Sequence, residues 1–268
     1  MKKEQLVALI KQKKSLLCVG LDTDLEKIPS AVRHFSADPV FEFNKLIIDA
    51  TIDYAVSYKP NTAFYEAMGL KGWESLQKTI DYIGDKAFVI ADAKRGDIGN
   101  TSKMYAKAFF EEMNAHAVTV APYMGEDSVT PFLGYDGKWV IVLGLTSNKG
   151  SDDFQQLTLQ NNDKLYEEVI RKVASWGGAD QLMFVVGATQ AEYIQAIRKI
   201  VPEHFLLIPG VGAQGGDLEA VCKYGVTKDG GLLINASRSI LYASSGNDFQ
   251  TAAAAEALKM KSAMEKYL

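Results

Sequence analysis

The chain has 268 residues, of which 47% are hydrophobic and 23% are charged, and its formal net charge is −4 at pH 7. This is the balance of an ordinary globular protein, and it gives no general basis for binding nucleic acid or an anionic membrane. Cys18 and Cys222 lie far apart in apolar contexts, which predicts buried free thiols in a reducing cytoplasm. The three histidines show no metal-ligand spacing, so we expect no zinc site.

The N-terminal segment, residues 1–14, reads MKKEQLVALIKQKK. Its apolar run is bounded by lysines and is too short for the core of a signal peptide or for a membrane span. We therefore expect a small amphipathic helix before the first strand.

Eight short runs of apolar and β-branched residues recur along the chain, at 15–21, 55–60, 87–94, 117–122, 139–145, 182–188, 205–210 and 231–237. Each run is nearly continuous rather than alternating, which favours parallel strands covered on both faces. Amphipathic segments between the runs predict helices at 41–54, 73–84, 101–114, 126–133, 163–177, 190–201, 216–225 and 252–268.

Strands and helices thus alternate eight times, at the size of a typical (β/α)8 barrel of about 250 residues. We predict an α/β fold of this TIM-barrel type, a single domain over residues 1–268 with an extra N-terminal helix. The competing fold is an open doubly wound sheet of about five to seven strands. The longest excursions from the alternation, 22–45 and 146–162, follow the first and fifth strands, where binding loops of a barrel lie.

Polar residues stand where the predicted strands end, and barrel enzymes place their chemistry there. A rim of solvated charges is the alternative interpretation, but many such ends converging at one mouth favour a functional site. The positions are Asp22, Lys59, Asp92, Lys94, Thr146, Ser147, the GVGAQGG segment after the seventh strand, Asn235, Ser237 and Arg238.

The third strand ends in the segment VIADAKRGDIGNT, residues 89–101. Asp92 and Lys94 are two apart, so on a strand their side chains share a face, and Asp97 follows in the turn before a helix. A lysine close to two carboxylates keeps its charged form, so its pKa should not be low. A Schiff-base lysine must be neutral, and therefore Lys94 is predicted to act as an acid or as a fixed positive charge.

The segment PGVGAQGGD, residues 209–217, contains the spacing G-x-G-x-x-G at Gly210, Gly212 and Gly215. It follows the seventh strand rather than the first, so a dinucleotide fingerprint is a weak interpretation. We expect a phosphate cradle of backbone N–H groups, with Arg238 adding a guanidinium after the eighth strand. The simpler alternative is a cluster of turn glycines beside a surface arginine.

These segments together resemble the orotidine 5′-phosphate decarboxylase family, in its longer bacterial form. The resemblance covers nearly the whole chain, and its most specific part is the pattern D-x-K-x-x-D-I-x-x-T combined with the P-G-V-G-A-Q loop. The matching segments are VGLDTD at 19–24, SYKPNTAFYE at 57–66, DAKRGDIGNT at 92–101, GLTSNKG at 144–150, PGVGAQGGD at 209–217 and NASRSI at 235–240.

The resemblance implies a role for each matching residue. Lys94 would be the general acid that protonates the ring carbon, with Asp92 beside the substrate carboxylate. Asp97, Ile98 and Thr101 would reach into the second active site of a homodimer. The expected substrate contacts are Asp22 and Lys59 to the ribose, Ser147 (in preference to Thr146) to the pyrimidine edge, Pro209 near the base, and Gln214 and Arg238 to the phosphate.

The expected activity is decarboxylation of orotidine 5′-phosphate to uridine 5′-phosphate, without a metal or an organic cofactor. The nearest alternative is a metal-dependent decarboxylase or epimerase of sugar phosphates on the same barrel. A Schiff-base aldolase and a non-catalytic nucleotide-binding module are further alternatives, and the flanking carboxylates argue against the aldolase.

Overall fold

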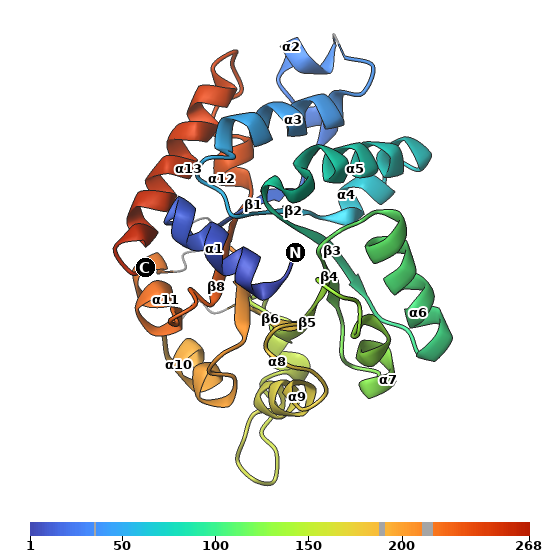
Figure 1. Ribbon diagram of the computed structural model, residues 1–268, viewed down its shortest axis with the longest axis vertical. Coiled ribbons are helices and arrows are strands. Elements are labelled where there is room, and N and C mark those ends of the chain that lie inside the picture. Colours follow the sequence, from blue (N-terminus) through green and yellow to red (C-terminus); the bar gives the residue numbers. More distant parts are fainter. Residues whose placement is uncertain (35, 188–190, 211–216) are drawn as a thin grey trace.

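The computed structural model shows a closed barrel of eight parallel strands in chain order (Figure 1). Strand β8 closes on β1 with Cys18 opposite Asn235, which rules out an open sheet. The structure describes residues 1–34, 36–187, 191–210 and 217–268. The strands are β1 (Leu17–Leu21), β2 (Ser57–Pro60), β3 (Phe88–Arg95), β4 (Ala117–Val120), β5 (Trp139–Leu145), β6 (Leu182–Val186), β7 (Phe205–Ile208) and β8 (Leu232–Ala236). The predicted TIM barrel is confirmed.

The interior of the barrel is filled by side chains from alternate strands. The Trp139 ring lies 6.1 Å from that of Phe88 and 6.2 Å from that of Phe205, centroid to centroid, and these residues open β5, β3 and β7. Contact between strands that are not neighbours requires side chains that point into the barrel, as in the layered packing of this fold. Cys18 and Cys222 are buried and free, as predicted.

Helices surround the strands at the predicted positions, with ends shifted by a few residues. Helix α3 begins at Pro39 because Asp38 caps it, its Oδ1 accepting a hydrogen bond from the Phe41 amide at 3.1 Å. The helices are α3 (Pro39–Thr51), α5 (Leu70–Ile83), α6 (Gly99–Lys107), α7 (Glu126–Val129), α9 (Leu165–Ala174), α10 (Ala191–Ile200), α11 (Leu218–Gly225) and α13 (Phe249–Glu265), with α3 packed against α13 (Figure 1).

The N-terminal helix α1 (Lys3–Lys13) covers the end of the barrel at which the strands begin (Figure 1). Leu6 and Ile10 are buried, and the Trp139 indole N–H donates to the Met1 carbonyl oxygen at 2.9 Å. The extra helix expected from the sequence is therefore present, and it leaves the opposite end of the barrel as the open mouth.

Shorter elements complete the loops. The excursion after β1 contains η1 (Leu25–Lys27) and α2 (Ser30–Arg33), and the one after β5 contains α8 (Ser151–Phe154). The remaining elements are α4 (Thr62–Glu66), η2 (Gly84–Lys86), η3 (Ala108–Glu112, π-helical), η4 (Thr130–Phe132) and α12 (Arg238–Leu241). Among the described residues, no helix is long and apolar enough to cross a bilayer.

Candidate active site

A cavity of about 260 Å³ opens where the strands end, and residues in β2, β3 and β8 or directly after β1 and β7 form part of its wall. Its lining is unusually rich in charged and amide side chains for a space of this size. The lining residues are Asp22, Lys59, Asn61, Asp92, Pro209, Gly210, Asn235, Ala236, Ser237, Arg238 and Ser239. A larger hollow beside α1, of about 560 Å³, lies at the other end of the barrel, away from the polar strand ends.

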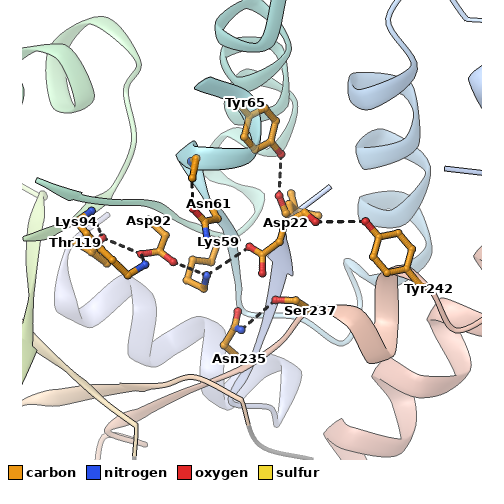
Figure 2. A network of polar contacts seen from close by, with 12 residues as sticks. Asp22, Lys59, Asn61, Tyr65, Asp92, Lys94, Thr119, Asn235, Ser237 and Tyr242 are labelled. Carbon is orange, nitrogen blue, oxygen red and sulfur yellow. Dashed lines mark hydrogen bonds and ion pairs between the residues drawn. The ribbon is translucent and has the colours of Figure 1, made fainter. Parts of the chain in front are cut away.

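A chain of charges crosses the mouth of the barrel (Figure 2). The Lys59 ammonium lies 2.8 Å from Asp92 Oδ2, and the Lys94 ammonium lies 2.6 Å from Asp92 Oδ1. Asp92 is thus held between two lysines on adjacent strands, the reverse of the arrangement that the sequence suggested for Lys94. Lys59 also lies 3.8 Å from Asp22 Oδ1.

In this row of charges, the attraction between opposite charges outweighs the effect of burial on the pKa values of Asp92 and Lys59. Burial alone would raise the pKa of Asp92, but the nearby charges of Lys59 and Lys94 hold it well below its usual value. Burial alone would likewise lower the pKa of Lys59, and the carboxylates of Asp92 and Asp22 raise it instead. At neutral pH the mouth therefore presents fixed charges.

Lys94 reaches this position through a break in the strand. Its φ is +47°, a left-handed conformation that is uncommon for a side chain other than glycine, and the β3–β4 register shifts between Ala91 and Arg95. The Lys94 amide donates to Thr119 Oγ1 at 2.8 Å. The predicted meeting of Asp92 and Lys94 occurs, but by a bulge rather than by regular alternation.

Thr119 on β4 completes the arrangement and was missed by the sequence analysis. Its hydroxyl donates to Asp92 Oδ1 at 2.9 Å while accepting the Lys94 amide, so one buried side chain fixes both residues. A lone threonine within the apolar run AVTVAP was the available signal. Asn61 was also missed, and it forms an isolated bridge with Asp92 and lines the cavity.

Arg95 points away from the mouth. Its guanidinium pairs with Glu66 and lies over the rings of Tyr105 and Phe109, at 5.3 and 5.4 Å from their centroids. This outward anchor fixes the backbone directly after Lys94.

Among the described residues, Asp97 does not join the chain of charges formed by Lys59, Asp92 and Lys94. Its Oδ1 accepts from the Ile98 amide at 2.8 Å and its carbonyl oxygen accepts from Ser102 Oγ at 2.5 Å, and in the described part of the chain it forms no ion pair with Lys94. Ile98 and Thr101 are exposed at the start of α6. Within the residues that the structure describes, Lys94 therefore pairs with Asp92, and the expected pairing with Asp97 is not formed.

Two tyrosines fix the backbone that carries Asp22 (Figure 2). The Tyr65 hydroxyl donates to the Leu21 carbonyl oxygen at 3.0 Å, and the Tyr242 hydroxyl donates to the Asp22 carbonyl oxygen at 3.3 Å. Tyr65 lies in α4 and Tyr242 directly follows α12, so both segments are tied to the backbone that carries the Asp22 carboxylate.

The loop after β5 distinguishes the two hydroxyl residues that follow the strand. Gln155 accepts from the Thr146 amide and donates to Thr146 Oγ1, both at 2.8 Å, and Thr146 Oγ1 donates to Asn148 Oδ1 at 2.6 Å. Ser147 is exposed, and a Cβ at Gly187 would lie 2.5 Å from its amide nitrogen. Glycine at that position therefore permits the close approach of β6 to this loop.

The predicted phosphate region is described in part. Pro209 and Gly210 follow β7, Arg238 opens α12 after β8, and all three line the cavity. Gln214, Gly212 and Gly215 lie outside the described residues. What the structure brings together on this side is Arg238 and the start of the glycine-rich segment.

The closed (β/α)8 barrel, with a lysine–aspartate chain at the carboxyl ends of its strands, is the arrangement of a TIM-barrel enzyme. Residues 15–255 match the family model described as Orotidine 5′-phosphate decarboxylase / HUMPS family, and the chain belongs to this family.

Similar proteins agree with this assignment. The orotidine 5′-phosphate decarboxylase of Phocaeicola vulgatus is 58% identical, covering 100% of this chain and 99% of the relative. That of Flavobacterium johnsoniae is 59% identical, covering 99% and 97%. The solved structure of Leishmania donovani OMP decarboxylase superposes with a TM-score of 0.83 at 37% identity, covering 98% of this chain and 99% of that one.

Proposed function

We propose that the cavity at the barrel mouth binds orotidine 5′-phosphate and that Lys94 donates the proton that replaces the carboxyl group. The chain is a carboxy-lyase that converts orotidine 5′-phosphate to uridine 5′-phosphate and CO2 in pyrimidine synthesis. The observation that supports the residue assignment is the 2.6 Å contact of the Lys94 ammonium with Asp92 at the mouth. The metal-dependent sugar-phosphate alternative is not favoured, because relatives matching the full chain carry the decarboxylase name.

The reaction explains why a fixed ammonium is needed. Loss of CO2 leaves an electron pair in the plane of the pyrimidine ring, where no neighbouring carbonyl delocalises it, and most decarboxylases use a cofactor as an electron sink. A preorganised positive charge at that point is the remaining means. At about 4 Å and an effective dielectric near 20, an ammonium stabilises a unit negative charge by roughly 4 kcal/mol.

This charge accounts for only part of the catalysis, because enzymes commonly lower barriers by about 8–23 kcal/mol. The rest we assign to contacts with the phosphate and ribose that hold the ring against Lys94. Asp92, kept ionised by Lys59, lies beside the substrate carboxylate in this proposal and adds a smaller repulsive term.

The other substrate contacts follow the chemistry of the lining. We assign the ribose to Asp22 and Lys59, the phosphate to Arg238 together with Gln214, and the face of the base to Pro209. Ser147 is assigned to the pyrimidine edge. Support for this choice is that Ser147 is exposed directly after β5, whereas Thr146 is half-buried.

The active enzyme in this proposal is a cytoplasmic homodimer in which Asp97, Ile98 and Thr101 reach the partner's site. Supporting it, large apolar side chains are exposed around these residues, and the Met124 side chain packs so close to Gly96 that an added Cβ there would lie 3.5 Å from Met124 Cε. The exposed fractions are 52% for Ile98, 56% for Met104, 90% for Tyr123 and 48% for Met124. Such a gathering of apolar groups is typical of an interface.

Two experiments test these proposals. Loss of orotidine 5′-phosphate absorbance in the ultraviolet, followed with chelator-treated protein, tests both the reaction and its independence from metal. An inactive sample, or one that needs added divalent cation, would refute the assignment.

Mixing the inactive Lys94→Ala and Asp97→Ala proteins tests the shared site. Each hybrid dimer would regain one intact site, so equal mixing should restore about a quarter of wild-type activity. No recovery after subunit exchange has been verified by mass would refute the shared site.

A further inference from the structure

Asn235, near the end of β8, has a side-chain amide whose nitrogen forms a hydrogen bond and whose oxygen does not. Its Nδ2 donates to Ser237 Oγ at 3.2 Å, and its Oδ1 is buried and has no hydrogen-bond donor among the described residues. The residue is 6% exposed and lines the cavity. Figure 2 shows Asn235 and Ser237 beneath Asp22 and Lys59.

The space around this amide is kept free by a glycine. A Cβ at Gly20 would lie 1.9 Å from Ser237 Oγ and 2.9 Å from Asn235 Oδ1, so any other residue there would displace the pair. Gly20 is opposite Lys59 in the β1–β2 register, which places the amide next to the charge chain. Asn235 is therefore accommodated at the mouth by the neighbouring strand.

Two acceptor oxygens without a hydrogen bond define what a ligand must offer at this position. Asp22 Oδ1 also lacks a hydrogen-bond donor among the described residues, and Lys59 is engaged by Asp92 at 2.8 Å. Two nearby oxygen acceptors call for two hydroxyl donors, and a phosphate, itself an acceptor, would be repelled. A ribose supplies two adjacent hydroxyl groups.

We propose that Asn235 is a specificity-determining residue whose side-chain carbonyl accepts a hydrogen bond from a ribose hydroxyl and favours ribonucleotides over deoxyribonucleotides. The inference rests on the proposed function and adds a residue to its ribose contacts. A site built to bind a hydroxyl group rejects an analogue that lacks it, because its own polar group is then left unpaired.

The test is calorimetric titration of the protein with UMP, 2′-deoxy-UMP and 3′-deoxy-UMP. The wild type should bind UMP about tenfold or more tightly than at least one deoxynucleotide. Asn235→Leu, which removes the acceptor at similar volume, should lose about tenfold in UMP affinity but less than twofold for that deoxynucleotide. Ser237→Ala, which keeps the acceptor, should retain the discrimination.

Equal losses for all three ligands in Asn235→Leu, or an unchanged UMP affinity, would overturn the inference. If the leucine variant does not fold, Asn235→Ala is titrated with the same three nucleotides, and the same affinity ratios are expected. Turnover of orotidine 5′-phosphate by the wild type is measured in parallel. Failure of that turnover counts against the proposed function, whereas normal turnover without hydroxyl-dependent effects at Asn235 counts against this inference alone.

Discussion

The two ends of the barrel use buried charge differently. At the covered end, the Arg198 guanidinium donates to the carbonyl oxygens of Val201, His204, Gly225 and Gly231, at 2.6–3.1 Å. At the mouth, Lys59, Asp92 and Lys94 bind one another, while oxygens of Asp22 and Asn235 lack donors among the described residues.

This difference indicates that the buried charge at the covered end serves stability, whereas the charges at the mouth serve function. Arg198 is satisfied by backbone groups that the fold itself brings together, and burial lowers its pKa to about 10. In the proposed function, the substrate supplies the donors that the oxygens of Asp22 and Asn235 lack, and without it these oxygens cost stability. His204 departs from this pattern: its buried ring nitrogens form no hydrogen bond of ordinary geometry among the described residues, and its ring lies 5.6 Å from that of Phe184, centroid to centroid.

The largest effect is expected from Lys94→Ala. Loss of both the proton donor and the positive charge should lower kcat by about 10⁴-fold or more. The Lys94 side chain is 49% exposed, so the thermal unfolding midpoint should change little and UMP should still bind. The matched control is Lys103→Ala, an exposed lysine on α6, which should be fully active. Near-normal turnover by Lys94→Ala would contradict the proton-donor role.

Arg198→Met tests whether the charge at the covered end of the barrel serves stability alone. Several buried carbonyl oxygens would lose their donor, so we expect a loss of about 3 kcal/mol in the free energy of unfolding, measured in urea. The kcat of the folded fraction should stay at the wild-type value. A large fall in kcat without loss of stability would show that the covered end is not purely structural.

Thr119→Val tests whether the strand break at Lys94 is held by a single hydroxyl. The Lys94 amide would lose its acceptor and Asp92 a donor, so kcat should fall about tenfold to a hundredfold with little change in KM. Thr119→Ser keeps the hydroxyl and should recover most of the rate. If the valine and serine variants behave alike, Thr119 acts by packing rather than by positioning.

The smallest effect concerns acid stability. His116 accepts the Val89 amide through Nδ1 at 3.0 Å, and burial lowers the pKa of the imidazole to about 4. Because this pKa is below the unfolded value of about 6.5, the neutral ring stabilises the fold above pH 6.5, and this contribution is lost as pH falls toward 4. From pH 7.5 to 5, the loss should be about 2 kcal/mol.

The variant His116→Asn should remove most of that pH dependence when unfolding free energies are compared at the two pH values. The control His34→Asn alters an exposed histidine and should leave the dependence unchanged. A steep loss that persists in His116→Asn would place the titration elsewhere.

The barrel could be predicted because each strand is a continuous apolar run and the runs recur evenly. Helices α4 and α12 were missed, since helices of five and four residues contain too few turns to show a period. Tyr65 in α4 and Tyr242, directly after α12, fix the backbone near Asp22. Short local elements at the mouth were therefore the least visible part of the fold.

The site was predictable in its residue types but not in its geometry. Asp92 and Lys94 could be paired from their spacing, whereas the left-handed backbone at Lys94 has no sequence signal, because lysine has no preference for it. Thr119 and Asn61 depend on contacts between strands distant in sequence. The place of Asp97 outside the charge chain was likewise not visible in the sequence, because its distance from Lys94 depends on how the turn before α6 folds.

A crystal structure of the protein with UMP bound tests the central claim most directly. We predict the Lys94 ammonium nitrogen within about 3.5 Å of C6 of the uracil ring, the carbon that receives the proton, with the phosphate at Arg238. A uracil ring bound with C6 turned away from Lys94, or a nucleotide bound outside the cavity at the strand ends, would contradict the account.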